Sequence, residues 1–209
     1  MCQKKASVGI FSREHASCYK WLIDFLLDSS LVRDVNFFCI SNKSLNLTKE
    51  IHQCTFAILY HTKNRGRINV TDVTDSLYDE ELQALSEILG RKNVVVVIDD
   101  LEDTSEVQKN AILKDQPSIG KLAQDLLLFG NDDKRMAKVS ETGKSHQQLR
   151  GIIKDHNRRL WVRECSKYKW LILTIFFIAF IFLLIALAVH LFLHYPYKRL
   201  HIKGTHKHA

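Results

Sequence analysis

Several motifs that would identify an enzyme or a metal protein are missing from this sequence. The five cysteines include no CxxC pair and match no zinc-site spacing. The GxGxxG fingerprint of a dinucleotide-binding fold does not occur. A phosphate-binding loop is incomplete, since Lys138 stands where that motif needs a glycine five residues before Gly143. We therefore expect neither a metal site nor a cofactor.

A secretion signal is also missing from the first residues. The apolar run there, residues 8–11, is far shorter than a signal-peptide core. Cys39 and Cys54 fall within apolar runs, as core thiols of a reducing compartment do. Both observations favour a cytosolic N-terminal domain. Glycosylation of a sequon such as Asn69-Val70-Thr71 would contradict that location.

One long apolar run is present, at residues 170–193. Between Leu171 and Val189 the only polar side chain is that of Thr174. About 20 apolar residues in a helix cross a hydrocarbon core of roughly 30 Å. We predict one transmembrane helix over 170–193, followed by a short basic, histidine-rich tail at 194–209. This layout is typical of a tail-anchored, single-pass protein of the endoplasmic reticulum or a downstream membrane.

The basic charge of the chain is concentrated around this run. The net charge is +7, yet residues 1–145 hold 19 Lys and Arg against 21 Asp and Glu, while residues 146–209 hold 11 against two. The domain itself is near neutral, so its charge gives no reason to expect that it binds nucleic acid. The lipid bilayer is the expected partner of the basic segments. Six basic residues precede the run and four follow it, which favours a cytosolic domain.

Two segments connect the domain to the predicted span. Residues 131–145 are polar and poor in apolar side chains, which predicts a linker. Residues 146–169 are basic and predict a juxtamembrane helix. Cys165 lies just before the span, where S-palmitoylation and an unmodified thiol are both compatible with the sequence.

Residues 1–130 alternate between apolar runs and amphipathic segments. Runs of four to seven apolar residues are typical of strands buried on both faces, as in parallel sheets covered by helices. We predict an α/β domain with a mostly parallel sheet of four to five strands and flanking helices. The expected strands lie at 7–12, 35–41, 54–60 and 93–98, and the expected helices at 15–30, 45–53, 77–89, 104–113 and 118–129.

Polar side chains gather where the predicted strands end. The carboxyl ends of parallel strands share one edge, where open α/β sheets bind ligands. The candidate ligand-binding residues at this edge are Ser12, Arg13, His61, Arg65, Arg67 and Asp99. Residues 63–67 have two interpretations, a loop that binds a phosphate or a partner and a solvated loop. The acidic residues 79–81 have two interpretations as well, a catalytic carboxylate in a cleft and a favourable charge at a helix N-terminus.

Three segments together resemble the Toll/interleukin-receptor (TIR) family or a related flavodoxin-like domain, over residues 7–129. Residues 7–13 (SVGIFSR) are similar to that family's first strand, and residues 18–22 (CYKWL) to its tryptophan-bearing first helix. Residues 76–82 (SLYDEEL) resemble its Ser…Trp-Cys-x-x-Glu-Leu segment, although no Trp-Cys pair occurs. By this resemblance Glu81 matches the glutamate that NAD-cleaving members use for catalysis.

Two hypotheses for function follow. The first is an interaction or signalling module, held at a membrane, that binds protein partners or self-associates as TIR-type domains do. The alternative is a membrane-tethered enzyme acting on NAD or a related nucleotide, with Glu81 as the acid/base. The absence of a complete catalytic motif favours the first.

Overall fold

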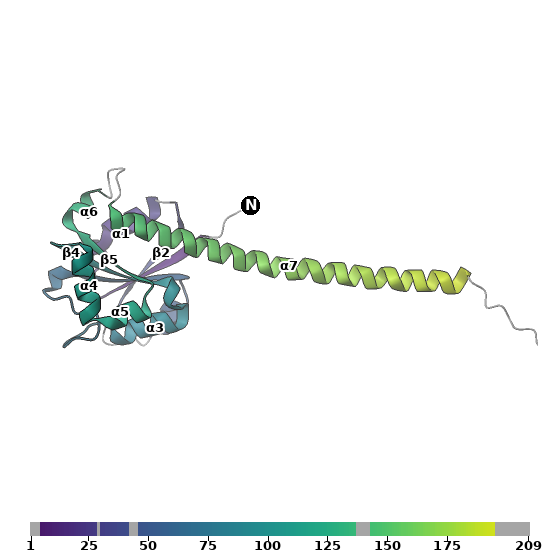
Figure 1. Ribbon diagram of the computed structural model, residues 1–209, viewed down its shortest axis with the longest axis horizontal. Helices are drawn as coiled ribbons and strands as arrows, with labels where there is room; N and C mark the ends of the chain where they lie inside the picture. The colour runs from purple at the N-terminus through teal and green to yellow at the C-terminus, as the bar shows by residue number, and fades with distance from the viewer. Residues whose placement is uncertain (1–4, 29, 42–45, 137–142, 195–209) are drawn as a thin grey trace, which may run out of the picture. The chain divides into compact units, whose positions relative to one another are not determined.

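The computed structural model describes residues 5–28, 30–41, 46–136 and 143–194, and it confirms the predicted α/β class (Figure 1). Five parallel strands form one sheet in the order β2-β1-β3-β4-β5. The strands are β1 (Ala6–Ser12), β2 (Val32–Cys39), β3 (Phe56–Thr62), β4 (Val94–Leu101) and β5 (Asp125–Gly130).

Burial explains why these segments form a parallel sheet. Every residue of β1 and β3 is buried, so neither strand has a solvent face and neither shows polar alternation. Ile10 in the middle of β1 lies opposite Phe37 of β2 and Ile58 of β3. Strand β2 lies at the edge of the sheet and is partly exposed, with Phe37 at 59%.

Helices cover both faces of the sheet. One hydrophobic cluster packs the segments α2 to α5 on one face, and a second packs α1 and the first part of α7 on the other (Figure 1). The helices are α1 (Lys20–Asp28), α2 (Leu47–Ile51), α3 (Asp79–Leu89), α4 (Glu106–Asp115), α5 (Pro117–Leu122), α6 (Asn131–Met136) and α7 (Lys144–His194). The short 3-10 turns are η1 (Ala16–Tyr19), η2 (Lys63–Arg65) and η3 (Arg91–Asn93).

The predicted helix over residues 118–129 is wrong in its second half. Helix α5 ends at Leu122, and residues from Asp125 onward form the edge strand β5. Leucine favours helices in isolation, but Leu127 and its neighbours are buried between the two helical layers and pair with β4. The predicted helix over 104–113 corresponds to α4, whose N-cap is Ser105, since Ser105 Oγ accepts a bond from Gln108 N–H at 3.3 Å.

The first part of α7 belongs to the domain. His146, Leu149, Ile153 and His156 follow one another at spacings of three or four residues and are all buried. Leu149 and Ile153 join the hydrophobic cluster beneath α1. The chain divides into two compact units, residues 1–162 and 163–209, so the domain reaches well beyond residue 145.

Helices are described within both segments that the sequence placed between the domain and the span. Helix α6 falls within residues 131–145, for which the sequence predicted a polar linker. Residues 146–169, predicted as a juxtamembrane helix, are helical as part of α7. The predicted tail, apart from His194, lies outside the described residues.

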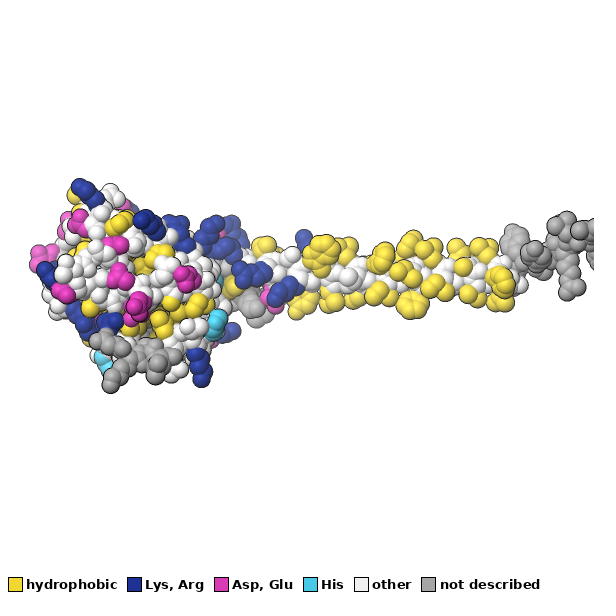
Figure 2. Space-filling view, turned by 90° about the horizontal axis from the view of Figure 1, so that it is seen from below, with side chains coloured by type: hydrophobic (Ala, Val, Ile, Leu, Met, Phe, Trp, Pro, Cys, Tyr) yellow, Lys and Arg dark blue, Asp and Glu magenta, His cyan; other side chains and the backbone are white. Residues whose placement is uncertain are grey.

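The C-terminal part of α7 has the properties of a membrane span. Among the described residues, α7 is the only helix long and apolar enough to cross a bilayer. Apolar side chains cover the face of this part that Figure 2 shows. Successive large apolar residues of the span are exposed, among them Phe176 at 69% and Phe192 at 85%. A helix that is apolar all round and unpacked is suited to lipid rather than to water.

Candidate functional site

The chain reverses its direction of winding at β1, which defines the place to look for a site. From β1 it proceeds to β2 on one side, and β3 then returns to the other side of β1. Ligands of doubly wound sheets bind at the carboxyl ends of strands beside such a switch point. Ser12 ends β1, and His61 and Thr62 end β3. The predicted site residues Ser12 and His61 therefore lie on either side of this switch point.

A cleft of about 430 Å³ opens at this edge. Its size lies within the range of small-molecule sites, roughly 300–1,000 Å³. The cleft is lined by Arg13, Ser41, Leu47, Ser76, Leu77, Asp79, Glu80 and Glu81. Two of the predicted residues, Arg13 and Glu81, therefore come together in one concave surface. The first turn of α3 supplies all three carboxylates of the lining.

Arg13 and Glu81 form an ion pair inside the cleft. Arg13 Nη2 lies 3.1 Å from Glu81 Oε1, and their side chains are only 18% and 13% exposed. Arg13 Nε donates to the backbone oxygen of Leu77 at 3.0 Å, and the guanidinium carbon lies 5.6 Å from the centre of the Tyr78 ring. These contacts fix the guanidinium before any ligand binds, which lowers the entropic cost of recognition.

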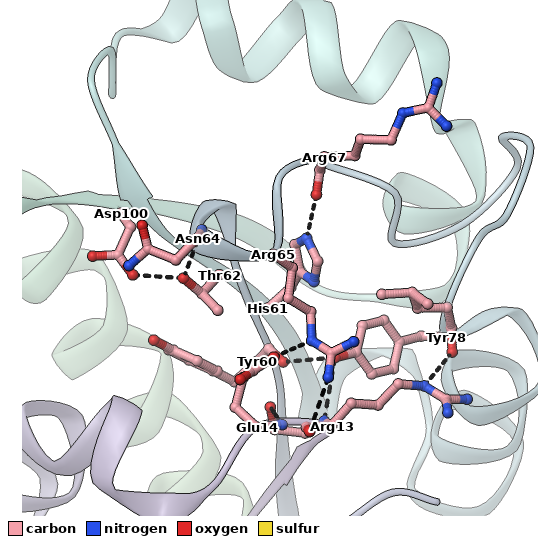
Figure 3. Close-up of polar contacts among 12 residues, drawn as sticks. Arg13, Glu14, Tyr60, His61, Thr62, Asn64, Arg65, Arg67, Tyr78 and Asp100 are labelled. Carbon is pink, nitrogen blue, oxygen red and sulfur yellow. Dashed lines mark hydrogen bonds and ion pairs between the residues drawn. The ribbon is translucent and has the colours of Figure 1, made fainter. Parts of the chain in front are cut away.

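A layer of buried polar side chains lies next to the cleft and contacts Arg13 of its lining. Ser12, His61 and Tyr78 are each fully buried. Tyr78 Oη accepts a bond from Arg13 N–H at 3.3 Å, and the Tyr78 ring meets the His61 ring edge-on at 5.9 Å. His61 Nε2 donates to the backbone oxygen of Arg67 at 2.8 Å, while burial lowers the pKa of His61. His61 is therefore neutral at pH 7 and holds the loop that follows β3 (Figure 3).

Arg65 lies at the rim of this layer and Arg67 points away from it (Figure 3). Arg65 pairs with Glu14 and donates to the backbone oxygen of Arg13 at 3.3 Å. Gly66 between the two arginines has φ +101°, which an L side chain rarely adopts, so the tight turn depends on glycine. Arg67 is 74% exposed and lies 3.8 Å from Asp75, apart from the cleft.

Asp99 belongs to a separate buried network. Its Oδ2 accepts bonds from Tyr60 Oη at 2.6 Å and Trp21 Nε1 at 2.9 Å, and it lies 3.0 Å from Lys134 Nζ. Burial raises the pKa of Asp99, although these donors oppose the shift. Asp100, the next residue, pairs with the same lysine. The network is satisfied internally, so Asp99 holds α1, β3, β4 and α6 together and does not face the cleft.

Sequence reasoning missed three residues of this edge. Tyr78, Glu14 and Lys134 each bond to a predicted site residue. Tyr78 directly precedes the acidic first turn of α3, and this position was a usable signal for a residue beside Glu81. Lys134 had no signal, since it lies in a polar segment that showed no apolar pattern.

The charge of the cleft limits what it can bind. Its described lining holds three carboxylates and one guanidinium, that of Arg13, which is already paired with Glu81. Asp79 accepts bonds from the Asp72 N–H and from Ser76 Oγ, so Glu80 is the carboxylate of the lining that is exposed without a partner among the described residues. The lining therefore favours cationic or hydroxyl-bearing groups over polyphosphate. No group of three or more side chains suited to a metal ion occurs among the described residues.

Comparison with known proteins adds no family to this description. No protein-family model matches the sequence, and a search of curated proteins finds no similar chain. Cys165, the candidate for lipidation, lies half-buried on α7.

Proposed function

We propose that the chain is a tail-anchored, single-pass membrane protein whose cytosolic α/β domain is an interaction or signalling module. The apolar part of α7 supports the anchor. The strand order, which is that of doubly wound flavodoxin-like sheets, supports the resemblance to TIR-type domains. Location in the endoplasmic reticulum or a downstream membrane remains part of this proposal.

The acidic cleft is the observation that carries the proposal. The exposed carboxylate of Glu80 offers acceptors for lysine and arginine side chains, and the guanidinium of Arg13 is already held by Glu81. A basic segment of another protein, or of a second copy of this chain, matches that surface. A nucleoside diphosphate matches this surface less well, because its negatively charged phosphates would lie beside the three carboxylates of the lining.

Site-specific photo-crosslinking in cells tests this function. A photoreactive residue at the exposed position Glu80, on the cleft, is expected to capture a defined protein or a second copy of the chain. The same group at the exposed position Lys114 of α4 serves as the control. Equal products from both positions, or none from position 80, would contradict an interaction site at the cleft.

The enzyme hypothesis has one observation in its favour. Glu81 lines a cleft beside a basic residue instead of pointing to solvent, as a catalytic glutamate that binds a ribose would. Full-length protein in lipid nanodiscs, incubated with NAD, would then release nicotinamide, and Glu81→Gln would abolish the release. No turnover, or turnover unchanged by Glu81→Gln, rejects this alternative.

A further inference from the structure

The amino-terminal edge of the sheet, opposite the cleft, carries a cluster that we name the basic edge. The basic edge consists of Lys5, Lys92, Lys154, Arg158 and Arg159. Arg159 Nη2 donates to the backbone oxygen of Lys92 at 3.0 Å. Asn157 accepts a bond from the N–H of Ala6, directly after Lys5, at 2.8 Å. All five belong to the compact unit of residues 1–162.

Few carboxylates offset the basic edge. Lys5, Lys92 and Lys154 are exposed, and none forms an ion pair with any residue that the structure describes. Arg158 and Arg159 both pair with Asp155, so one carboxylate serves two guanidinium groups. The basic edge therefore presents excess positive charge to its surroundings.

The cleft carries the charge opposite to that of the basic edge. Its described lining, at the carboxyl-terminal edge of the sheet, has three carboxylates against one guanidinium. A negatively charged surface attracts the basic edge of such a domain and repels the cleft. The charge distribution therefore defines one preferred orientation toward an anionic partner.

We propose that the basic edge binds the anionic phospholipid headgroups of the bilayer that holds the span, which leaves the cleft open to partners. This inference rests on the proposed function, since anionic lipids enrich the cytosolic leaflet. Only 11 residues lie between Arg158 and Trp170, so the bilayer is present at high effective concentration whatever path they take. Headgroup phosphates and carboxylates accept charge-assisted bonds from lysine and arginine.

Lysine acetylation of the full-length protein in nanodiscs tests the proposal. A neutral acetylating reagent is applied in phosphatidylcholine alone and with about 30 mol% phosphatidylserine added, and mass spectrometry gives the rate at each lysine. We expect phosphatidylserine to slow the acetylation of Lys5 and Lys92 by about threefold or more. About 0.5 M NaCl is expected to restore both acetylation rates. Lys63, exposed at the carboxyl-terminal edge, is expected to change little.

Two matched double variants separate lipid binding from a general effect of surface potential. K154Q/R158Q removes two exposed charges of the basic edge and leaves Lys5 and Lys92 as reporters. K20Q/R67Q removes two charges from side chains that are 72% and 74% exposed near the other edge. Because each cation changes binding to an anionic surface by roughly fivefold, the first variant is expected to lose the protection and the second to keep it.

Unchanged rates at Lys5 and Lys92, or equal slowing of Lys63, would overturn the proposal. Loss of protection in both variants would also overturn it, since the effect would then follow net charge alone. The nanodisc assay does not depend on which side of a cellular membrane the domain occupies. Its failure is thus distinguishable from failure of the cytosolic topology, which protease accessibility in cells reports.

Discussion

Asn157 of α7 accepts a hydrogen bond from the backbone N–H of Ala6, 151 residues earlier in the chain. The same side chain donates to the backbone oxygen of Leu31 at 2.7 Å. One amide therefore ties the helix that leads to the span to the starts of β1 and β2. His156, the preceding residue, contacts Thr55 and Asn93, which lie just before β3 and β4.

Asn157→Ala is expected to destabilise the domain. The change leaves the Ala6 N–H and the Leu31 oxygen without this partner, and such partly buried groups cost about 1–3 kcal/mol. Thermal unfolding of the full-length protein in micelles measures the effect as a lower Tm. Arg158→Ala, at a side chain that is 75% exposed, is the control. Equal Tm values for both variants would show that the Asn157 bonds do not stabilise the fold.

A fragment ending at residue 145 is expected to fail to fold, whereas one ending at 162 folds cooperatively. The shorter fragment loses Leu149 and Ile153, which are 0% and 1% exposed. Each such side chain contributes about 1.5–3 kcal/mol by burial, a large part of a domain's net stability. Circular dichroism and thermal melts of both fragments provide the measurement. A native melt of the shorter fragment would contradict the assignment of α7 to the domain.

His146 predicts a loss of stability in acid. The ring lies against Phe25 and Phe129, with centroid distances of 4.6 Å and 5.0 Å, and neither ring nitrogen has a partner among the described residues. Burial lowers the pKa of His146, opposed by Asp133 of α6 and reinforced by Arg150. The unfolded state therefore binds more protons below about pH 6.5, and stability falls as the pH decreases from there toward the folded-state pKa.

His146→Phe is expected to raise the Tm at neutral pH and to weaken its decrease between about pH 6.5 and pH 5. An apolar ring removes two unpaired nitrogens from the aromatic cluster. His61, whose pKa burial also lowers, retains part of the acid sensitivity. His52→Phe, at an exposed histidine, is the control and is expected to leave the pH profile unchanged. An identical profile for His146→Phe would contradict this account.

The ion pair in the cleft is expected to show measurable coupling. A double-mutant cycle of Arg13→Ala and Glu81→Gln isolates the pair, whose side chains are 18% and 13% exposed. Because the pair is partly buried, we expect a coupling free energy of about 1 kcal/mol, above that of a typical exposed pair. Chemical denaturation of the four proteins gives this value. Additive effects would mean that Glu81 is not held by Arg13 in solution.

Much of the fold could be predicted from local patterns, but the role of α7 could not. The apolar runs within β1, β3 and β4 are those expected of strands that are buried on both faces. In residues 146–160 the spacing of His146, Leu149, Ile153 and His156 already marks an apolar stripe. Basic residues between them obscured it, and two of its members are histidines, which count as polar until their surroundings are known.

The site could be predicted only in part. The rule that ligands bind at the carboxyl ends of parallel strands identifies the strand ends, but not the directions of their side chains. This rule placed Arg13 at the correct edge, and the resemblance to TIR-type domains added Glu81. It also grouped Asp99 with them, although that carboxylate turns inward to Trp21, 78 residues away. Only the tertiary structure reveals such a pairing, since no local pattern relates the two residues.

Protease accessibility in intact microsomes tests the central claim most directly. Full-length protein carrying an epitope tag at each end is synthesised, inserted and treated with protease, with and without detergent. The account predicts that residues 1–162 are digested without detergent, while a small fragment with the C-terminal tag is protected. A protected N-terminal domain, or a glycosidase-sensitive mass shift from a sequon such as Asn69, would contradict the cytosolic topology.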